Sequence, residues 1–132
     1  MVIVEKSGLP VGLHVCSASP SEVTLVGSVL ENRFTDEMPL RLIGDKAYDS
    51  DPLDEYLEEI GIEMISPHKI NRVKPPTQDG RPLRRYKKRW QVERFNAWIQ
   101  NFRKVVVRWE RKIENYRGFA LLACAIILAK RL

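Results

Sequence analysis

The sequence has little cysteine and little histidine. Cys16 and Cys124 lie far apart without a CxxC spacing, and neither stands in a cluster with His14 or His68. A disulfide framework or a structural zinc site needs several such residues at close spacing, so neither is expected here. We therefore expect a protein of a reducing compartment, the cytoplasm.

Long apolar runs and a secretory leader are also lacking. No basic-then-apolar segment opens the chain. The most apolar stretch, residues 118–129, is shorter than the roughly 20 residues that span a bilayer. We expect a buried C-terminal helix and no membrane-spanning segment.

Acidic residues are scarce in one part of the chain. The whole sequence has 22 Lys and Arg against 17 Asp and Glu, but Glu93 and Glu110 are the only acids between Arg81 and Lys112. That segment contains twelve basic residues: Arg81, Arg84, Arg85, Lys87, Lys88, Arg89, Arg94, Arg103, Lys104, Arg108, Arg111 and Lys112. Such concentrated positive charge favours nucleic acid or an anionic membrane surface as partner.

The first quarter of the chain predicts a β-hairpin followed by a helix. The β-branched runs at 2–5 and 11–18 flank a turn that contains glycine and proline, as in a hairpin. Ser19 and Glu22 have the spacing of a capping box, with proline between them at the first helical position. We therefore expect a helix over residues 20–32.

The middle of the chain predicts a βαβ unit. Strand-like runs at 40–43 and 62–65 enclose a helix at 51–59, and Gly61 is placed to end that helix. Short connections in this order indicate parallel strands. The segment 67–82, rich in proline and basic residues, is expected to form a mobile basic loop.

Two further sets of polar residues have simple explanations. An acidic patch is accounted for by capping of the helix at 51–59 and by its dipole: Asp49, Asp51, Asp54 and Glu55. His14 and His68 have no ligand-like neighbours in sequence. We expect structural or surface roles for both sets.

Residues 83–104, LRRYKKRWQVERFNAWIQNFRK, predict one long helix because no Gly or Pro interrupts them. On such a helix, Tyr86, Arg89 and Glu93 lie on one stripe, and Glu93 is the only acid in a cationic field. A second stripe is apolar and is expected to face a core: Val92, Phe95, Ile99 and Phe102.

Two interpretations of this helix are open at this stage. A basic amphipathic helix is most often a solvated face, and a pair between Arg89 and Glu93 would contribute only about 0.3–0.5 kcal/mol. The other interpretation rests on spacing. Tyr86, two residues, Arg89, three residues and Glu93 resemble the C-terminal signature of insertion-sequence transposases of the DDE superfamily. That signature continues with six residues and a lysine, whereas Gln100 stands here.

A second motif agrees with that resemblance. Asp45 follows the strand at 40–43 and precedes a small residue and an aromatic, Ala47 and Tyr48, as at the second acidic position of these transposases. Alone, Asp45 could simply end a strand or cap a turn. Both motifs in this order imply an α/β, partial ribonuclease-H-like fold over 1–132. It would contain a hairpin, a βαβ unit and C-terminal helices, with the first catalytic strand missing.

The resemblance implies phosphodiester hydrolysis and strand transfer at transposon ends. Asp45 and Glu93 would be the catalytic carboxylates and the ligands of Mg²⁺ or Mn²⁺, with two ions in the completed site. The partner would be double-stranded DNA, as transposon ends and as target. Tyr86 and Arg89 would act at the DNA backbone. Further phosphates would be held by Arg85, Lys88, Arg94, Arg103 and Lys104.

The superfamily uses three acids, and the first, on the opening strand of the fold, has no counterpart here. We therefore expect the C-terminal part of a catalytic domain, inactive alone. An N-terminal half, which another reading frame could encode, would complete it, and the active form would be a homo-oligomer.

Other functions stay open. The chain could be a non-catalytic nucleic-acid-binding remnant of a transposase that keeps the basic helix. A weaker alternative is a basic helix on an anionic membrane. Tryptophans at 90, 98 and 109 could pack in a core, as aromatics at helical spacing most often do, or stack on a flipped base.

Overall fold

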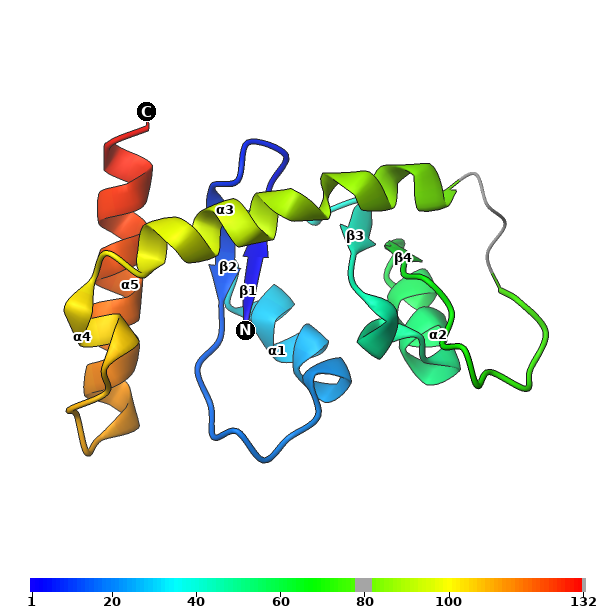
Figure 1. The fold of residues 1–132 in the computed structure, drawn as a ribbon, viewed down its shortest axis with the longest axis horizontal. Helices are drawn as coiled ribbons and strands as arrows, with labels where there is room; N and C mark the ends of the chain where they lie inside the picture. The colour runs from blue at the N-terminus through cyan, green and yellow to red at the C-terminus, as the bar shows by residue number, and fades with distance from the viewer. Residues whose placement is uncertain (78–81, 132) are drawn as a thin grey trace.

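Two short sheets lie beneath one long helical rod (Figure 1). The structure, a computed structural model, describes residues 1–77 and 82–131. It is a mixed α/β arrangement, as the sequence predicts. The elements in chain order are β1 (Val2–Val4), β2 (Pro10–Leu13), η1 (Glu22–Leu25), α1 (Val26–Glu31), β3 (Arg41–Ile43), η2 (Lys46–Tyr48), α2 (Asp51–Glu59), β4 (Glu63–Ile65), η3 (Pro82–Arg89), α3 (Trp90–Ile99), α4 (Arg103–Val106) and α5 (Ile113–Ala129).

The predicted hairpin is confirmed, although its second strand is shorter than expected. Strands β1 and β2 pair antiparallel with Val2 opposite Leu13, and Gly8 in the turn has φ +86°. The predicted start of the following helix is wrong. The helix begins at Glu22 as a 3-10 turn, because the backbone N–H and the hydroxyl of Thr24 both donate to the carbonyl of Ser21.

The βαβ unit is also confirmed. Strands β3 and β4 pair parallel, with Leu42 opposite Met64, and α2 connects them. Gly61 follows α2 with φ +77°, a conformation that glycine adopts without a Cβ penalty. The predicted loop at 67–82 has no helix or strand over 67–77, and its residues 78–81 lie outside the described part of the chain.

The predicted long helix is largely confirmed and has two parts. Residues 82–99, which we call the helical rod, consist of the 3-10 helix η3 and the α-helix α3 (Figure 1). The rod ends at Ile99 and not at 104, because the side chain of Asn101 donates to the carbonyls of Ala97 and Trp98 at 3.3 and 3.2 Å. Phe102 is then extended, and α4 begins as a separate short helix.

The described part of the chain has two hydrophobic clusters, and one of them holds the α-helical part of the rod. Phe95, 1% exposed, packs with the hairpin and α5 in one cluster; its buried members are Leu13, Phe95, Ala120, Cys124 and Ile127. Other residues of the predicted apolar stripe, Ile99 and Phe102, pack against the same cluster. The second cluster joins α1, α2 and β4 and comprises Val26, Leu30, Leu53, Leu57, Ile62 and Met64. The other part of the rod, η3, contacts β3 and β4, so the rod bridges the hairpin and the βαβ unit.

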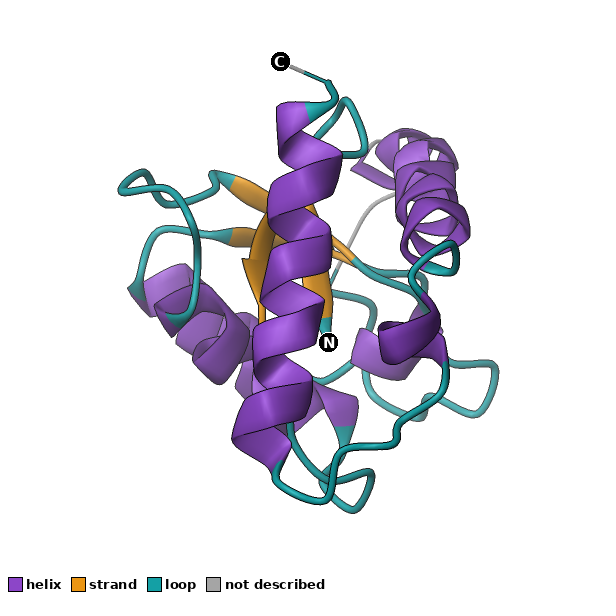
Figure 2. Ribbon diagram, turned by 90° about the vertical axis from the view of Figure 1, so that its left-hand side faces the viewer, coloured by secondary structure: helices purple, strands orange, loops and turns teal. Residues whose placement is uncertain are grey.

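The last helix, α5, lies against the hairpin (Figure 2). It begins at Ile113, and Lys112 before it has an extended backbone. One face is buried, and burial raises the pKa of the Cys124 thiol to about 11. Among the described residues, no helix combines the length and the apolar character that a membrane crossing needs.

Candidate active site

Asp45 occupies a tight turn directly after β3. Its side chain caps the 3-10 turn η2 by accepting the backbone N–H of Ala47 at 2.8 Å. The preceding residue, Gly44, has no room for a side chain. An added Cβ would lie 2.6 Å from the Met64 methyl group and 2.7 Å from the Tyr48 ring. The Gly-Asp pair thus allows a close approach that fixes where the carboxylate emerges.

Glu93 lies in the first turn of α3, one turn after Arg89, and the Arg89 guanidinium joins it to Asp45. Nη1 of Arg89 lies 3.7 Å from Asp45 Oδ2, and Nη2 lies 3.3 Å from Glu93 Oε1. The fold therefore brings these three side chains together from distant parts of the sequence. Charge-assisted hydrogen bonds are usually about 2.7–2.9 Å long, so Arg89 holds both acids loosely.

The two carboxylates can be tested as metal ligands. The Asp45 and Glu93 side chains are 43% and 67% exposed, so ions and DNA can reach them. Mg²⁺ prefers oxygen ligands and is usually bound through one or two carboxylates, with waters and substrate phosphate completing its shell. Both side chains therefore offer the kind of oxygen ligand that such an ion prefers. No cluster of three or more metal-binding side chains occurs within residues 1–77 and 82–131.

The predicted DNA contacts Arg85, Tyr86 and Arg89 lie on η3, and Arg89 contacts both acids. Arg89 is half-buried and lies over the Tyr86 ring at 5.5 Å. Arg85 is exposed on the same segment and lies 4.0 Å from Glu63, a residue that also pairs with Arg41. The positive charge at this end of the rod is thus partly neutralised within the protein.

The remaining predicted contacts are spread along the rod and beyond it. Lys88 is exposed. Arg94 stacks on Trp90 at 4.0 Å. Arg103 and Lys104 lie on α4, after the rod has ended. These cations therefore do not form one cluster at the acids but extend away from them.

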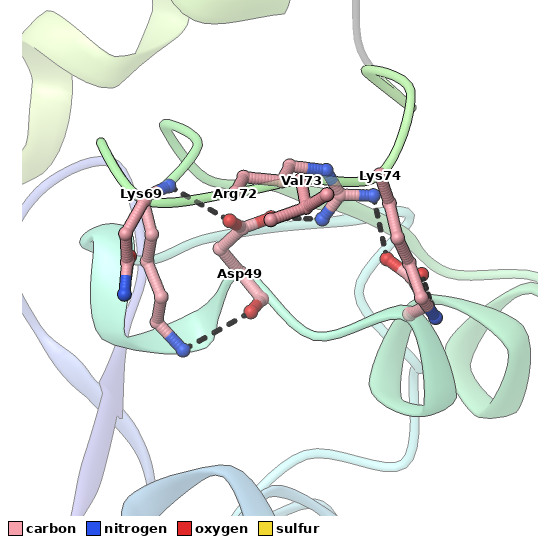
Figure 3. A pocket seen from close by; sticks show the side chains of 7 residues that line it. Asp49, Lys69, Arg72, Val73 and Lys74 are labelled. Carbon is pink, nitrogen blue, oxygen red and sulfur yellow. Dashed lines mark hydrogen bonds and ion pairs between the residues drawn. The ribbon is translucent and has the colours of Figure 1, made fainter.

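The structure contains an ionic network that the sequence interpretation missed (Figure 3). Asp49, whose side chain is only 3% exposed, accepts the Lys69 backbone N–H at 2.7 Å and an Arg72 N–H at 2.7 Å. It also contacts Nδ1 of His68 at 2.9 Å. Capping of α2 does not explain these contacts, because they reach the segment after β4.

The network extends to Asp51. Arg72 donates to Asp51 at 2.6 Å, and Lys74 donates to it at 2.7 Å, around an open pocket of about 300 Å³. Burial favours a raised pKa at Asp49, but the Lys69 N–H, His68 and the Arg72 charge outweigh it and hold the pKa below its usual range. Hydrogen bonds from Lys74 and Arg72 lower the pKa of Asp51 as well.

This network holds the turn that carries Asp45. Asp45 stands at the start of η2, and Asp49 stands at its end. Because Asp49 is tied to Lys69 and Arg72, the segment after β4 anchors the far end of the turn. No local sequence signal marks the network, since its partners are about 20 residues apart.

Comparisons with known proteins agree with the motifs. A model of the family described as "Transposase DDE domain" matches residues 1–128. A Burkholderia cepacia protein described as a transposase for insertion sequence element IS402 is 28% identical, over 96% of this chain and 60% of its own length. A Brucella ovis protein described as a transposase for insertion sequence element IS6501 is 34% identical, over 65% of either chain. The chain thus spans about 60–65% of these relatives. No solved structure matches it significantly.

Proposed function

The chain belongs to the transposase DDE domain family, and from this premise we propose that it carries part of the metal-dependent active site of an insertion-sequence transposase. The reaction would be phosphodiester hydrolysis and strand transfer at transposon ends. The observation that supports it best is the convergence of Asp45 and Glu93 on one guanidinium. We further propose that the hairpin, the βαβ unit and the C-terminal helices are parts of a ribonuclease-H-like fold.

Asp45 and Glu93 would hold a divalent ion, Mg²⁺ or Mn²⁺. When bound, such an ion stabilises charge on the oxygens of the phosphodiester. Arg89, which holds both carboxylates in this structure, would then turn to the DNA. Its planar guanidinium suits a bidentate contact with phosphate. Tyr86, beneath Arg89, would orient that side chain.

A complete site would need more than these two acids. Two ions require further oxygen ligands, and the relatives are longer than this chain. We propose that a third acid, from outside residues 1–132, completes the site, and that the active form is a homo-oligomer on double-stranded DNA. The second candidate function is a DNA-binding remnant without catalysis. The absence of a third metal-binding side chain beside the pair, among the described residues, favours it.

DNA binding tests the shared part of both candidates. We expect the chain to bind a duplex with an affinity that falls with salt, at a slope of about −0.9 per neutralised phosphate. The double variant Arg85→Ala/Lys88→Ala should bind more weakly and reduce the slope by about 2, or about 1 for each lost phosphate contact. Fluorescence anisotropy over a salt series measures both quantities.

The matched control is Lys130→Ala, which removes an exposed cation beyond the end of α5. It should leave the slope unchanged. A wild-type affinity that does not depend on salt would contradict the proposed function, and so would equal slopes for the wild type and the double variant.

A further inference from the structure

The three tryptophans of the chain have different surroundings. Trp98 packs against the cluster that contains Phe95, and Arg131 covers its ring at 3.8 Å. Arg94 covers the Trp90 ring at 4.0 Å. Trp109 is 67% exposed, and no cation of the described chain covers its ring. Exposed tryptophan is costly in water, so this position invites an explanation.

The segment around Trp109 is held in place by its neighbours. Arg108 folds back to donate to the carbonyl of Glu110 at 3.1 Å and lies over the Tyr116 ring. The Glu110 carboxylate turns to Lys104, whose ammonium lies 3.4 Å away. The residues on both sides of Trp109 are thus engaged within the protein, and the indole is left at the surface.

A hollow of about 230 Å³ adjoins the indole and is lined by Arg103, Lys104 and Trp109. It is smaller than the roughly 300–1,000 Å³ of ordinary ligand pockets, so it suits one flat group and not a whole cofactor. Arg111 and Lys112 add positive charge nearby in sequence, against the single acid Glu110. A flat aromatic wall beside cations fits a ligand that is both planar and anionic.

We propose that Trp109, Arg103 and Lys104 form a subsite for one unpaired nucleotide of DNA. The base stacks on the indole, and its phosphate lies against the two cations. The base must be unpaired, because a base inside a duplex has both faces stacked. This inference rests on the proposed function and adds the form of DNA that is bound.

The subsite lies away from the acidic pair, toward the other end of the rod. It is formed by α4 and by the segment that follows α4, beyond the end of the rod at Ile99.

The test compares two fluorescent DNA probes, a blunt duplex and the same duplex with a five-nucleotide single-stranded overhang, at one salt concentration. Trp109→Ala should weaken binding of the overhang probe about 5- to 150-fold, which corresponds to about 1–3 kcal/mol per stacked base. Binding of the blunt duplex should change less than twofold. Trp109→Phe should bind the overhang probe almost as tightly as the wild type does, because phenylalanine keeps an aromatic face.

Leu122→Ala is the control, because it removes an exposed apolar side chain of α5 that does not line the hollow. It should change neither affinity. Equal effects of Trp109→Ala on both probes, or no effect on either, would overturn the subsite while leaving duplex binding intact. A failure of the wild type to bind both probes would overturn the proposed function and the subsite together.

A protein partner is the competing explanation for the exposed indole. Val106 and Val107 are exposed close by and could extend an interface with a second copy of the chain. Light scattering of the wild type and of Trp109→Ala decides this point. Dissociation of a dimer by Trp109→Ala, with unchanged affinity for the overhang probe, would replace the nucleotide subsite with a dimer interface.

Discussion

Replacing Asp49 with alanine is expected to lower the free energy of unfolding by about 3 kcal/mol. Breaking a buried ion pair typically costs about 3–5 kcal/mol, and the lower end applies because the pocket beside Asp49 is open to water. The substitution leaves the Lys69 backbone N–H without its acceptor and removes one of the two acids that hold Arg72. Urea unfolding at pH 7 measures the change.

The pH dependence provides a second test of the same network. The pKa of Asp49 is lower in the folded chain than its usual value, so the stabilisation is complete above the unfolded pKa of about 3.9. It is lost as pH falls through the folded pKa. The difference between wild type and Asp49→Asn should therefore shrink as the pH falls below about 4.

Asp36→Ala serves as the control for Asp49, because it removes an exposed acid that makes no ion pair within the described residues. Its effect should stay within about 0.5 kcal/mol. A cost at Asp49 no larger than at Asp36 would mean that the network does not hold the turn that carries Asp45.

Phe95→Ala is expected to be at least as damaging, at about 3–5 kcal/mol. Phe95 is the buried residue of α3, and it joins the rod to β2 and α5. Removing the ring leaves a cavity two residues from Glu93, in the helix that positions this acid. Thermal or urea unfolding measures the loss.

Trp90→Ala is the matched comparison on the same helix. Trp90 is 44% exposed and Arg94 lies over its ring, so its removal should cost only about 0.5–1 kcal/mol, the contribution of an exposed cation–π contact. Similar losses for Phe95→Ala and Trp90→Ala would show that α3 is not anchored through Phe95.

The order of elements could be predicted because each has a local cause. The βαβ unit follows from strand, helix and strand with short connections, and Gly61 marks the end of α2. The ends of helices could not be predicted equally well, since they depend on particular side chains. The rod ends where the side-chain amide of Asn101 donates to backbone carbonyls. The helix propensities of residues 100–104 do not predict an end at this point.

The spacing motifs single out Asp45 and Glu93, but they give no information about the environment of either residue. The sequence interpretation expected Asp45 and Glu93 to meet, and the structure places both at Arg89. The Asp49 network was missed because its members come from two segments that meet only after β3 and β4 pair. Asp49 also suits a local role at the start of α2, so its position in the sequence does not indicate that Lys69 and Arg72 bind it.

The most direct test is calorimetric titration of the chain with Mn²⁺. We predict binding of one ion by the wild type and affinities at least tenfold lower for Asp45→Asn and Glu93→Gln, since even the loss of a group that only supports a ligand costs about 10–100-fold. Arg89→Gln should bind Mn²⁺ more tightly, because it removes the cation between the acids. Asp36→Asn removes an exposed acid that makes no ion pair within the described residues, and it should leave the affinity unchanged. Equal affinities for the wild type, Asp45→Asn and Glu93→Gln would contradict the assignment of these two residues as one metal-binding pair.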